Sequence, residues 1–244
     1  METSRLAEIV TAPVTGSFDI SSADDHRRVH RLADEMVEAE TIEPDDHDDA
    51  TGDPLDLRIA VKLARSKQAV LRTEWTGSLA VVFAMWGESR RLRPRSPDNP
   101  TGEDALHIKL DQLDWLFTES AIDWTLIPVD DGDPENSAQV AEERAAQHHR
   151  GGHVRILRLA DAIPASEGPL SGLNSADDSR KGGAIVFGAH VAVEAGADAV
   201  VMTDADNSVN LGQTGLLLEP FAAGAGAVIG DRKHPAAVLV KAEA

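Results

Sequence analysis

Acidic side chains follow four apolar runs of this 244-residue chain. They are Glu88, the pair Asp130-Asp131, the triplet Asp204-Ala205-Asp206, and Asp231. If the runs are parallel strands of one sheet, these acids meet at one edge, where like charges repel unless a cation or hydrogen-bond donors offset them. Mg²⁺ or Mn²⁺ suits such an edge, because a hard cation takes few carboxylates and completes its shell with phosphate oxygens. Helix N-capping by single Asp residues is the alternative interpretation.

The elements that would position these acids alternate from Leu79 onward. Strands are expected at 79–86, 124–132, 154–163, 199–206 and 226–233, from their short apolar runs. Helices are expected around 106–117, after Pro134, over 181–195 up to Gly196, and in part of 211–224. This alternation predicts parallel βαβ units with right-handed crossovers. Ligands bind such sheets outside the carboxyl ends of the strands.

The segment before this region, residues 1–75, is acidic and predicted to be helical. The first 57 residues contain 16 acidic and four basic side chains. A helix with Ser22 as its N-cap would place Val29, Leu32, Ala33, Met36 and Val37 on one face. A second helix would bury Leu55, Ile59, Leu63 and Val70. Between them, the Asp-rich stretch around His47 is interpreted as a charged loop rather than a cation site.

Composition restricts the class of protein. The net charge of −19 argues against a nucleic-acid surface, which needs a basic stripe. The chain has no Cys, no apolar run of the ~18 residues that a bilayer requires, and no basic and apolar leader at its N-terminus. We therefore expect a soluble cytoplasmic protein without a transmembrane segment. A homo-oligomer or a partner chain is compatible with these features.

Three motifs in order carry a family resemblance. They are VDDG followed by Pro134 and Ser137, the helix start Lys181-Gly182-Gly183-Ala184, and TDAD at 203–206. Together they resemble the nucleotide-binding half of the family 2 glycosyltransferases, with the dolichyl-phosphate mannose synthase-like branch nearest. The resemblance covers roughly Leu79 to Lys233. It implies a GT-A fold over 76–244, a Rossmann-type, mainly parallel α/β sheet flanked by helices. It also implies hexosyl transfer from a UDP- or GDP-linked sugar with Mg²⁺ or Mn²⁺.

The resemblance also implies roles for individual residues. Those implied to contact the nucleotide are Ala84, Trp86, Glu88, Asp130, Asp131, Lys181 and Asp204. Asp204 and Asp206 are implied to hold the metal, and Arg232 a phosphate or the acceptor. An Asp can accept from a ring N–H of uracil or guanine, and a helix N-terminus with small residues suits phosphate. The alternatives are a turn residue for Asp131 and a solvated loop for Arg180 and Lys181.

Departures from the family pattern keep other functions open. Ser208 stands where that branch often has Gln, and Asp231 where it has Ser. Family members continue past the position of Lys233 into an acceptor half that usually supplies the catalytic base, so no base is assigned here. A truncated or non-catalytic nucleotide-binding module is therefore the alternative to an enzyme. A sugar nucleotidyltransferase is a weaker alternative, because Glu88 and Ser89 interrupt the Gly-rich start that such enzymes need.

Overall fold

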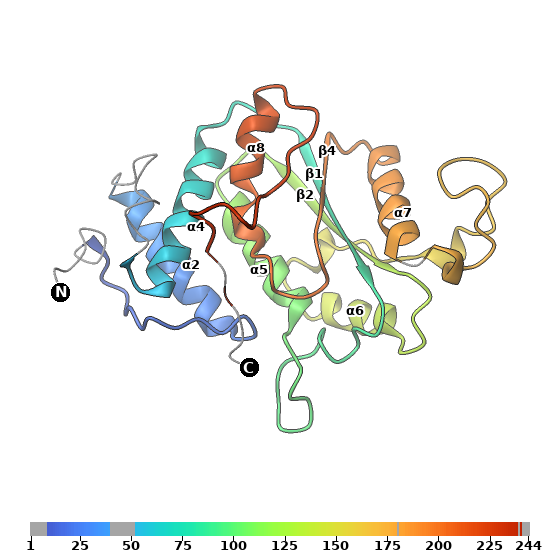
Figure 1. The fold of residues 1–244 in the computed structure, drawn as a ribbon, viewed down its shortest axis with the longest axis horizontal. Coiled ribbons are helices and arrows are strands. Elements are labelled where there is room, and N and C mark those ends of the chain that lie inside the picture. Colours follow the sequence, from blue (N-terminus) through green and yellow to red (C-terminus); the bar gives the residue numbers. More distant parts are fainter. Residues whose placement is uncertain (1–8, 40–51, 180, 239, 241–244) are drawn as a thin grey trace. The chain divides into compact units, whose positions relative to one another are not determined.

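The computed structural model describes residues 9–39, 52–179, 181–238 and 240 (Figure 1). The chain forms two compact units. The first comprises Met1–Trp75, Trp115–Ser120 and Asn210–Ala244, and the second Thr76–Asp114 and Ala121–Val209. The first boundary thus falls between residues 75 and 76, and the segment from Asn210 groups with the N-terminal helices.

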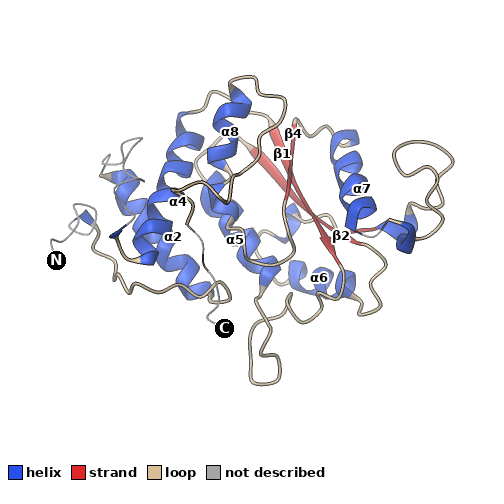
Figure 2. Ribbon diagram, viewed as in Figure 1, coloured by secondary structure: helices blue, strands red, loops and turns tan. Residues whose placement is uncertain are grey.

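The second unit contains a four-stranded, all-parallel sheet (Figure 2). Its strands are β1 (Ser78–Met85), β2 (Asp123–Asp130), β3 (Leu157–Arg158) and β4 (Ala199–Met202), in the order β3-β2-β1-β4. β1 pairs with β2 from Ser78↔Asp123 to Met85↔Asp130, so both strands end at the same edge. The predicted α/β class with a Rossmann-like parallel sheet is confirmed.

Both faces of the central strand β1 are buried. Leu79 to Phe83 are all buried, as expected for a parallel strand covered on both sides. α7 (Lys181–Glu194) packs on one face, where Ala184 and Ala192 meet Val82 and Val129. Gly188 permits this approach, because a Cβ there would lie 2.5 Å from Val82 Cγ1.

Two further helices contribute to this unit: α5 (Ala105–Phe117), with its residues up to Asp114, and α6 (Ser137–Ala146). α5 packs on the face of the sheet opposite to α7. Its Lys109 Nζ lies 5.7 Å from the ring centroid of Phe83, whose side chain points to the other face of β1 than that of Val82. Its predicted apolar positions, Leu106, Leu110, Leu113, Leu116 and Phe117, are all buried. α6 packs against β2 and starts three residues after Pro134.

Two predicted strands differ in the structure. The expected strand over 154–163 pairs only at Leu157–Arg158, and a 3₁₀ turn follows at Leu159–Asp161. The expected strand over 226–233 is not formed, and Ile229 within it is 90% exposed. Gly226 and Gly230 flank only three apolar residues there, and glycine disfavours a strand that gains little burial.

The first unit is helical. α2 (Ala23–Glu38) begins after Ser22, whose side chain accepts from the Asp25 N–H as predicted. α4 (Leu55–Arg72) packs against α2, and α8 (Gly215–Ala222) packs against α4. The core combines the predicted face of α2 with Leu57, Ile59 and Leu63 of α4. His47 and most of the predicted charged loop lie outside the described residues.

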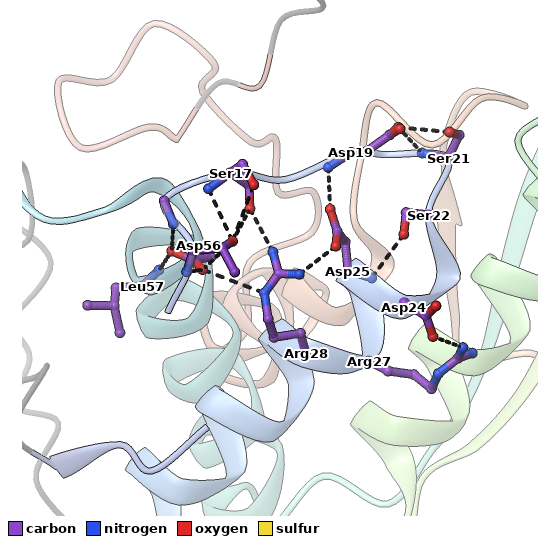
Figure 3. A network of polar contacts seen from close by, with 12 residues as sticks. Ser17, Asp19, Ser21, Ser22, Asp24, Asp25, Arg27, Arg28, Asp56 and Leu57 are labelled. Carbon is purple, nitrogen blue, oxygen red and sulfur yellow. Dashed lines mark hydrogen bonds and ion pairs between the residues drawn. The ribbon is translucent and has the colours of Figure 1, made fainter. Parts of the chain in front are cut away.

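A buried polar network joins the start of α2 to the start of α4 (Figure 3). The fully buried Asp56 accepts from the N–H groups of Thr15, at 2.7 Å, and Gly16, at 3.1 Å. Arg28 reaches both sides, with Nε 3.6 Å from Asp56 Oδ2 and Nη2 donating to the Ser17 carbonyl at 2.7 Å. Breaking such a buried pair is costly, so the network fixes the chain before α2.

None of the described helices combines the length and apolar content needed to cross a membrane.

Candidate functional site

A cavity of about 210 Å³ opens at the carboxyl edge of the sheet. The chain runs outward from β1 through β2 to β3 and then returns, through α7, to place β4 on the other side of β1. The strand order therefore reverses between β1 and β4, which is where open α/β sheets bind ligands. The cavity is lined by one residue near the end of β1, by residues that follow β1, β2 and β4, and by the first residue of α7: Ala84, Trp86, Glu88, Arg91, Asp131, Lys181, Asp204, Ala205 and Asp206.

The turn after β1 presents an exposed aromatic ring to the cavity. Trp86 is 61% exposed, which is unusual for a large apolar side chain beside a buried strand. Gly87 adopts φ +69°, which few other residues tolerate, and its N–H donates to Asp133 Oδ1 at 2.9 Å. The Glu88 N–H donates to Ser137 Oγ at 2.9 Å. These bonds fix the backbone on which Trp86 and Glu88 stand.

The two neighbouring acids after β2 have different environments. Asp130 Oδ1 accepts from the N–H groups of Gly132 and Asp133, both at 2.9 Å, so this carboxylate stabilises the turn. Asp131 lines the cavity, and its buried Oδ1 has no hydrogen-bond partner among the described residues. Burial, with the charge of Asp130, raises the pKa of Asp131 to about 6. Asp131, rather than Asp130, is therefore the member of the pair that lines the cavity.

Lys181 and Asp204, which both line the cavity, form an ion pair. Lys181 Nζ donates to Asp204 Oδ1, and the two side chains are 64% and 47% exposed. Lys181 is the first residue of α7, so its ammonium stands near the free N–H groups of the helix N-terminus. Lys181 could contact an anion here only by exchanging Asp204 for it.

Asp206 is held in its ionised form. Its Oδ1 accepts from Ser208 Oγ at 2.6 Å and from the Ser208 N–H at 3.1 Å. Burial opposes ionisation, but these bonds and the charge of Lys109 outweigh it, and the pKa of Asp206 is lowered. Ser208 thus has a defined contact in this turn.

A chain of charged side chains connects the β1 edge to the β4 edge. Arg91 donates to Glu88 and, through Nε at 3.0 Å, to Glu103. Glu103 Oε2 in turn accepts from the Asn207 N–H at 3.0 Å. Burial raises the pKa of Glu88, although Arg91 opposes the change. The chain of contacts ties the loop after β1 to the residues that follow Asp206.

Seven of the nine residues predicted for the site line one cavity: Ala84, Trp86, Glu88, Asp131, Lys181, Asp204 and Asp206. Asp130 instead accepts hydrogen bonds within the turn after β2, and Arg232 is an exposed residue of the first unit. Arg180 lies outside the described residues.

Sequence reasoning did not identify Arg91 or Lys109. Arg91 stands in an Arg-rich run that the sequence presents as a loop, and nothing in that run distinguishes it from Arg90 or Arg93. The position of Lys109 in the sequence could have drawn attention to it. It follows Leu106 by three residues and precedes Leu113 by four, so a charge lies on the apolar face of α5.

The carboxylates of the cavity are compatible with a divalent cation that also binds the phosphates of a bound substrate. Within the described ranges, no three His, Cys, Asp or Glu side chains are grouped to hold a metal. Mg²⁺ is usually bound by one or two carboxylates plus substrate phosphates, so Asp204 and an ionised Asp206 fit it as partial ligands. A cation at Asp204 would compete with Lys181.

Comparisons with protein-family models, with curated proteins and with solved structures found no match to this chain. The chemistry of the cavity must therefore be inferred from its own residues.

Proposed function

We propose that the chain is a glycosyltransferase that uses a nucleoside-diphosphate sugar, UDP- or GDP-linked, with Mg²⁺ or Mn²⁺. One observation carries the proposal: Trp86, Asp131, Lys181, Asp204 and Asp206 line a single cavity at the point where the strand order reverses. The aromatic face of Trp86 matches a base, and the carboxylate of Asp131 matches its ring N–H. The cation of Lys181 matches a diphosphate, and the two acids Asp204 and Asp206 match a bridging metal ion.

Each group has a defined task in this proposal. The ring of Trp86 stacks on the base, a contact available to any base. Asp131 accepts from a ring N–H, which uracil and guanine offer and cytosine does not. Lys181, at the N-terminus of α7, contacts the diphosphate. The divalent cation, held by Asp204 and Asp206, would neutralise charge on the leaving nucleoside diphosphate.

The cavity is large enough to enclose only part of such a ligand. Its volume of about 210 Å³ is below the roughly 300–1,000 Å³ of typical small-molecule sites. A nucleoside-diphosphate sugar bound here therefore extends past the exposed side chains of Lys181 and Asp204. The sugar to be transferred then lies outside the cavity.

Calorimetric titration tests donor binding. UDP, GDP, ADP and CDP are compared with Mn²⁺ present and with EDTA. We expect UDP or GDP to bind with Mn²⁺ and to bind at least tenfold more weakly with EDTA. Asp206→Asn should abolish that difference. The control is Asp123→Asn, an exposed acid at the opposite end of β2, which should leave the affinity unchanged. Absence of binding by every nucleotide contradicts the proposal.

A separate measurement distinguishes an enzyme from a binding module. The purified chain is incubated with UDP- and GDP-sugars and a panel of polyprenyl phosphates, hydroxy acids and sugars. A glycosylated product in the presence of Mn²⁺ supports the transferase. Nucleotide binding without a product from any acceptor, and with donor hydrolysis at most, supports the module.

A further inference from the structure

Lys109 is a fully buried lysine directly beneath the Asp204–Asp206 turn. It lies on α5, and its solvent-exposed fraction is 0%. Burying an ammonium carries a large desolvation penalty, so a protein retains one only with strong compensation. The compensating contacts therefore indicate what the charge does.

Those contacts lead to one place. Lys109 Nζ donates to the main-chain carbonyl of Asp206, and the ammonium lies 5.7 Å from the ring centroid of Phe83 in β1. The negative charges that favour its protonated form belong to Asp206, Glu103 and Asp204. The charge of Lys109 is thus directed at the turn that carries both acids of the cavity.

Glu103 holds the same turn from its other side. Its Oε2 accepts from the Asn207 N–H, and its main-chain carbonyl accepts from Asn207 Nδ2, both at 3.0 Å. Two consecutive residues of the turn are therefore fixed by groups of opposite charge, at the Asp206 carbonyl and at the Asn207 amide. Neither contact uses the carboxylates of Asp204 or Asp206, which remain directed to the cavity.

We propose that Lys109 is a positioning residue, which holds the Asp204–Asn207 turn so that both carboxylates face the ligand cavity. The part of the inference that concerns ligands rests on the proposed function. The part that concerns the turn does not, because it follows from the contacts of Lys109 alone. Lys109 itself does not line the cavity.

The test uses the full chain with Lys109→Met, which keeps the length of the side chain and removes its charge and donor. Lys67→Met is the control, because Lys67 is also largely buried and bound to an Asp, but belongs to the first unit. Amide hydrogen exchange is measured over 203–209 and over β1 and β2. We expect exchange over 203–209 to accelerate at least tenfold in Lys109→Met, with β1 and β2 unchanged, and no change over 203–209 in Lys67→Met.

Nucleotide affinity is then measured with Mn²⁺ for the same variants. A positioning role predicts a loss of roughly tenfold or more in Lys109→Met, with the unfolding midpoint of the sheet unit changed little. If the wild type binds no nucleotide, the proposed function fails while the exchange result still decides the role of Lys109.

Three results overturn the inference. One is unchanged exchange over 203–209 in folded Lys109→Met. A second is a uniform acceleration across β1, β2 and the turn, which would make Lys109 a general core residue. The third concerns folding. If Lys109→Met does not fold, Lys109→Gln is measured in the same way, and failure of both variants while Lys67→Met folds also overturns it.

Discussion

Lys181 and Asp204 neutralise each other across the mouth of the cavity. Their ion pair joins the first residue of α7 to the turn after β4, two elements that approach only because β4 returns to the far side of β1. The pair is half exposed, so it is weak and exchangeable. A diphosphate and a divalent cation could each take one partner, since the phosphate attracts the ammonium and the cation attracts the carboxylate.

This exchange predicts that Lys181→Met affects the diphosphate and not the nucleoside. Loss of one contact between an ammonium and a phosphate should weaken the binding of UDP or GDP about tenfold. Uridine or guanosine, which have no phosphate, should bind as they do to the wild type. Calorimetry with both ligands makes the comparison, with Lys62→Met on α4 as the control. An equal loss for nucleoside and diphosphate would assign Lys181 to the base instead.

Asp130 and Asp131 should respond oppositely to substitution. Asp130→Ala removes the acceptor of two turn N–H groups and should cost ~1–3 kcal/mol of unfolding free energy. Asp131→Asn should weaken nucleotide binding by a similar free energy while leaving the fold intact. If Asp130 alone controls affinity, the assignment of the pair is reversed.

The raised pKa of Asp131 gives its substitution a pH dependence. Between its unfolded pKa of about 4 and its folded pKa of about 6, the folded state binds the proton more tightly. The stability that this proton contributes is therefore lost as pH rises through about 6. Asp131→Asn should be more stable than the wild type by ~1 kcal/mol at pH 7.5 and equal to it below pH 4, as measured by urea unfolding. The same advantage at both pH values would exclude this cause.

The elements of the site could be predicted because they are locally encoded. A run such as LAVVFAM has no polar position to expose, so burial on both faces identifies β1. Lys181 and Gly196 likewise mark the ends of the sequence in which α7 forms. Acids at the ends of such runs then meet because parallel strands end together.

Other features depend on contacts that no local pattern contains. The run Val228-Ile229 has the composition of a strand, yet it forms no strand with any of the described residues, and Ile229 is exposed. VDDG does not reveal which Asp faces the turn, because that depends on the N–H groups of Gly132 and Asp133 in three dimensions. The pattern of α5 places the charge of Lys109 among apolar residues, but the partner of that charge, the Asp206 carbonyl, is known only from the structure.

The approach of α7 to the sheet makes Gly188 sensitive to a single methyl group. An added Cβ would lie 2.5 Å from Val82 Cγ1 and 2.9 Å from Val129 Cγ2, both in strands that cannot move freely. Gly188→Ala should therefore lower the unfolding free energy by ~1–3 kcal/mol, although alanine favours the helix. Gly226→Ala, where nothing lies within 4 Å, should change it by less than about 0.5 kcal/mol. Equal midpoints in urea would show that α7 is not close-packed on β1.

The first unit should lose stability in acid because of His30. This ring stacks on Trp115, with centroids 4.4 Å apart and planes 7° apart, and its buried Nε2 has no hydrogen-bond partner among the described residues. Burial, with the charges of His26 and Lys67, lowers the pKa of His30 to about 3. Of the charged groups near the ring, Lys67 belongs to α4, and its partner Asp34 belongs to α2 itself and also accepts from Trp115 Nε1 at 3.0 Å.

Between pH 3 and 6.5 the unfolded state therefore binds a proton that the folded state excludes. Stability contributed by neutral His30 is complete above pH 6.5 and falls as pH drops toward 3, by up to about 1.4 kcal/mol per pH unit. His30→Phe keeps a flat ring against Trp115 and removes the titration. Amide exchange of α2, corrected for the intrinsic effect of pH and referred to β1 in the same molecule, measures the difference. We expect protection of α2 to fall between pH 6.5 and 4.5 in the wild type and to stay level in His30→Phe. A parallel fall in both proteins would assign the acid sensitivity to groups other than His30.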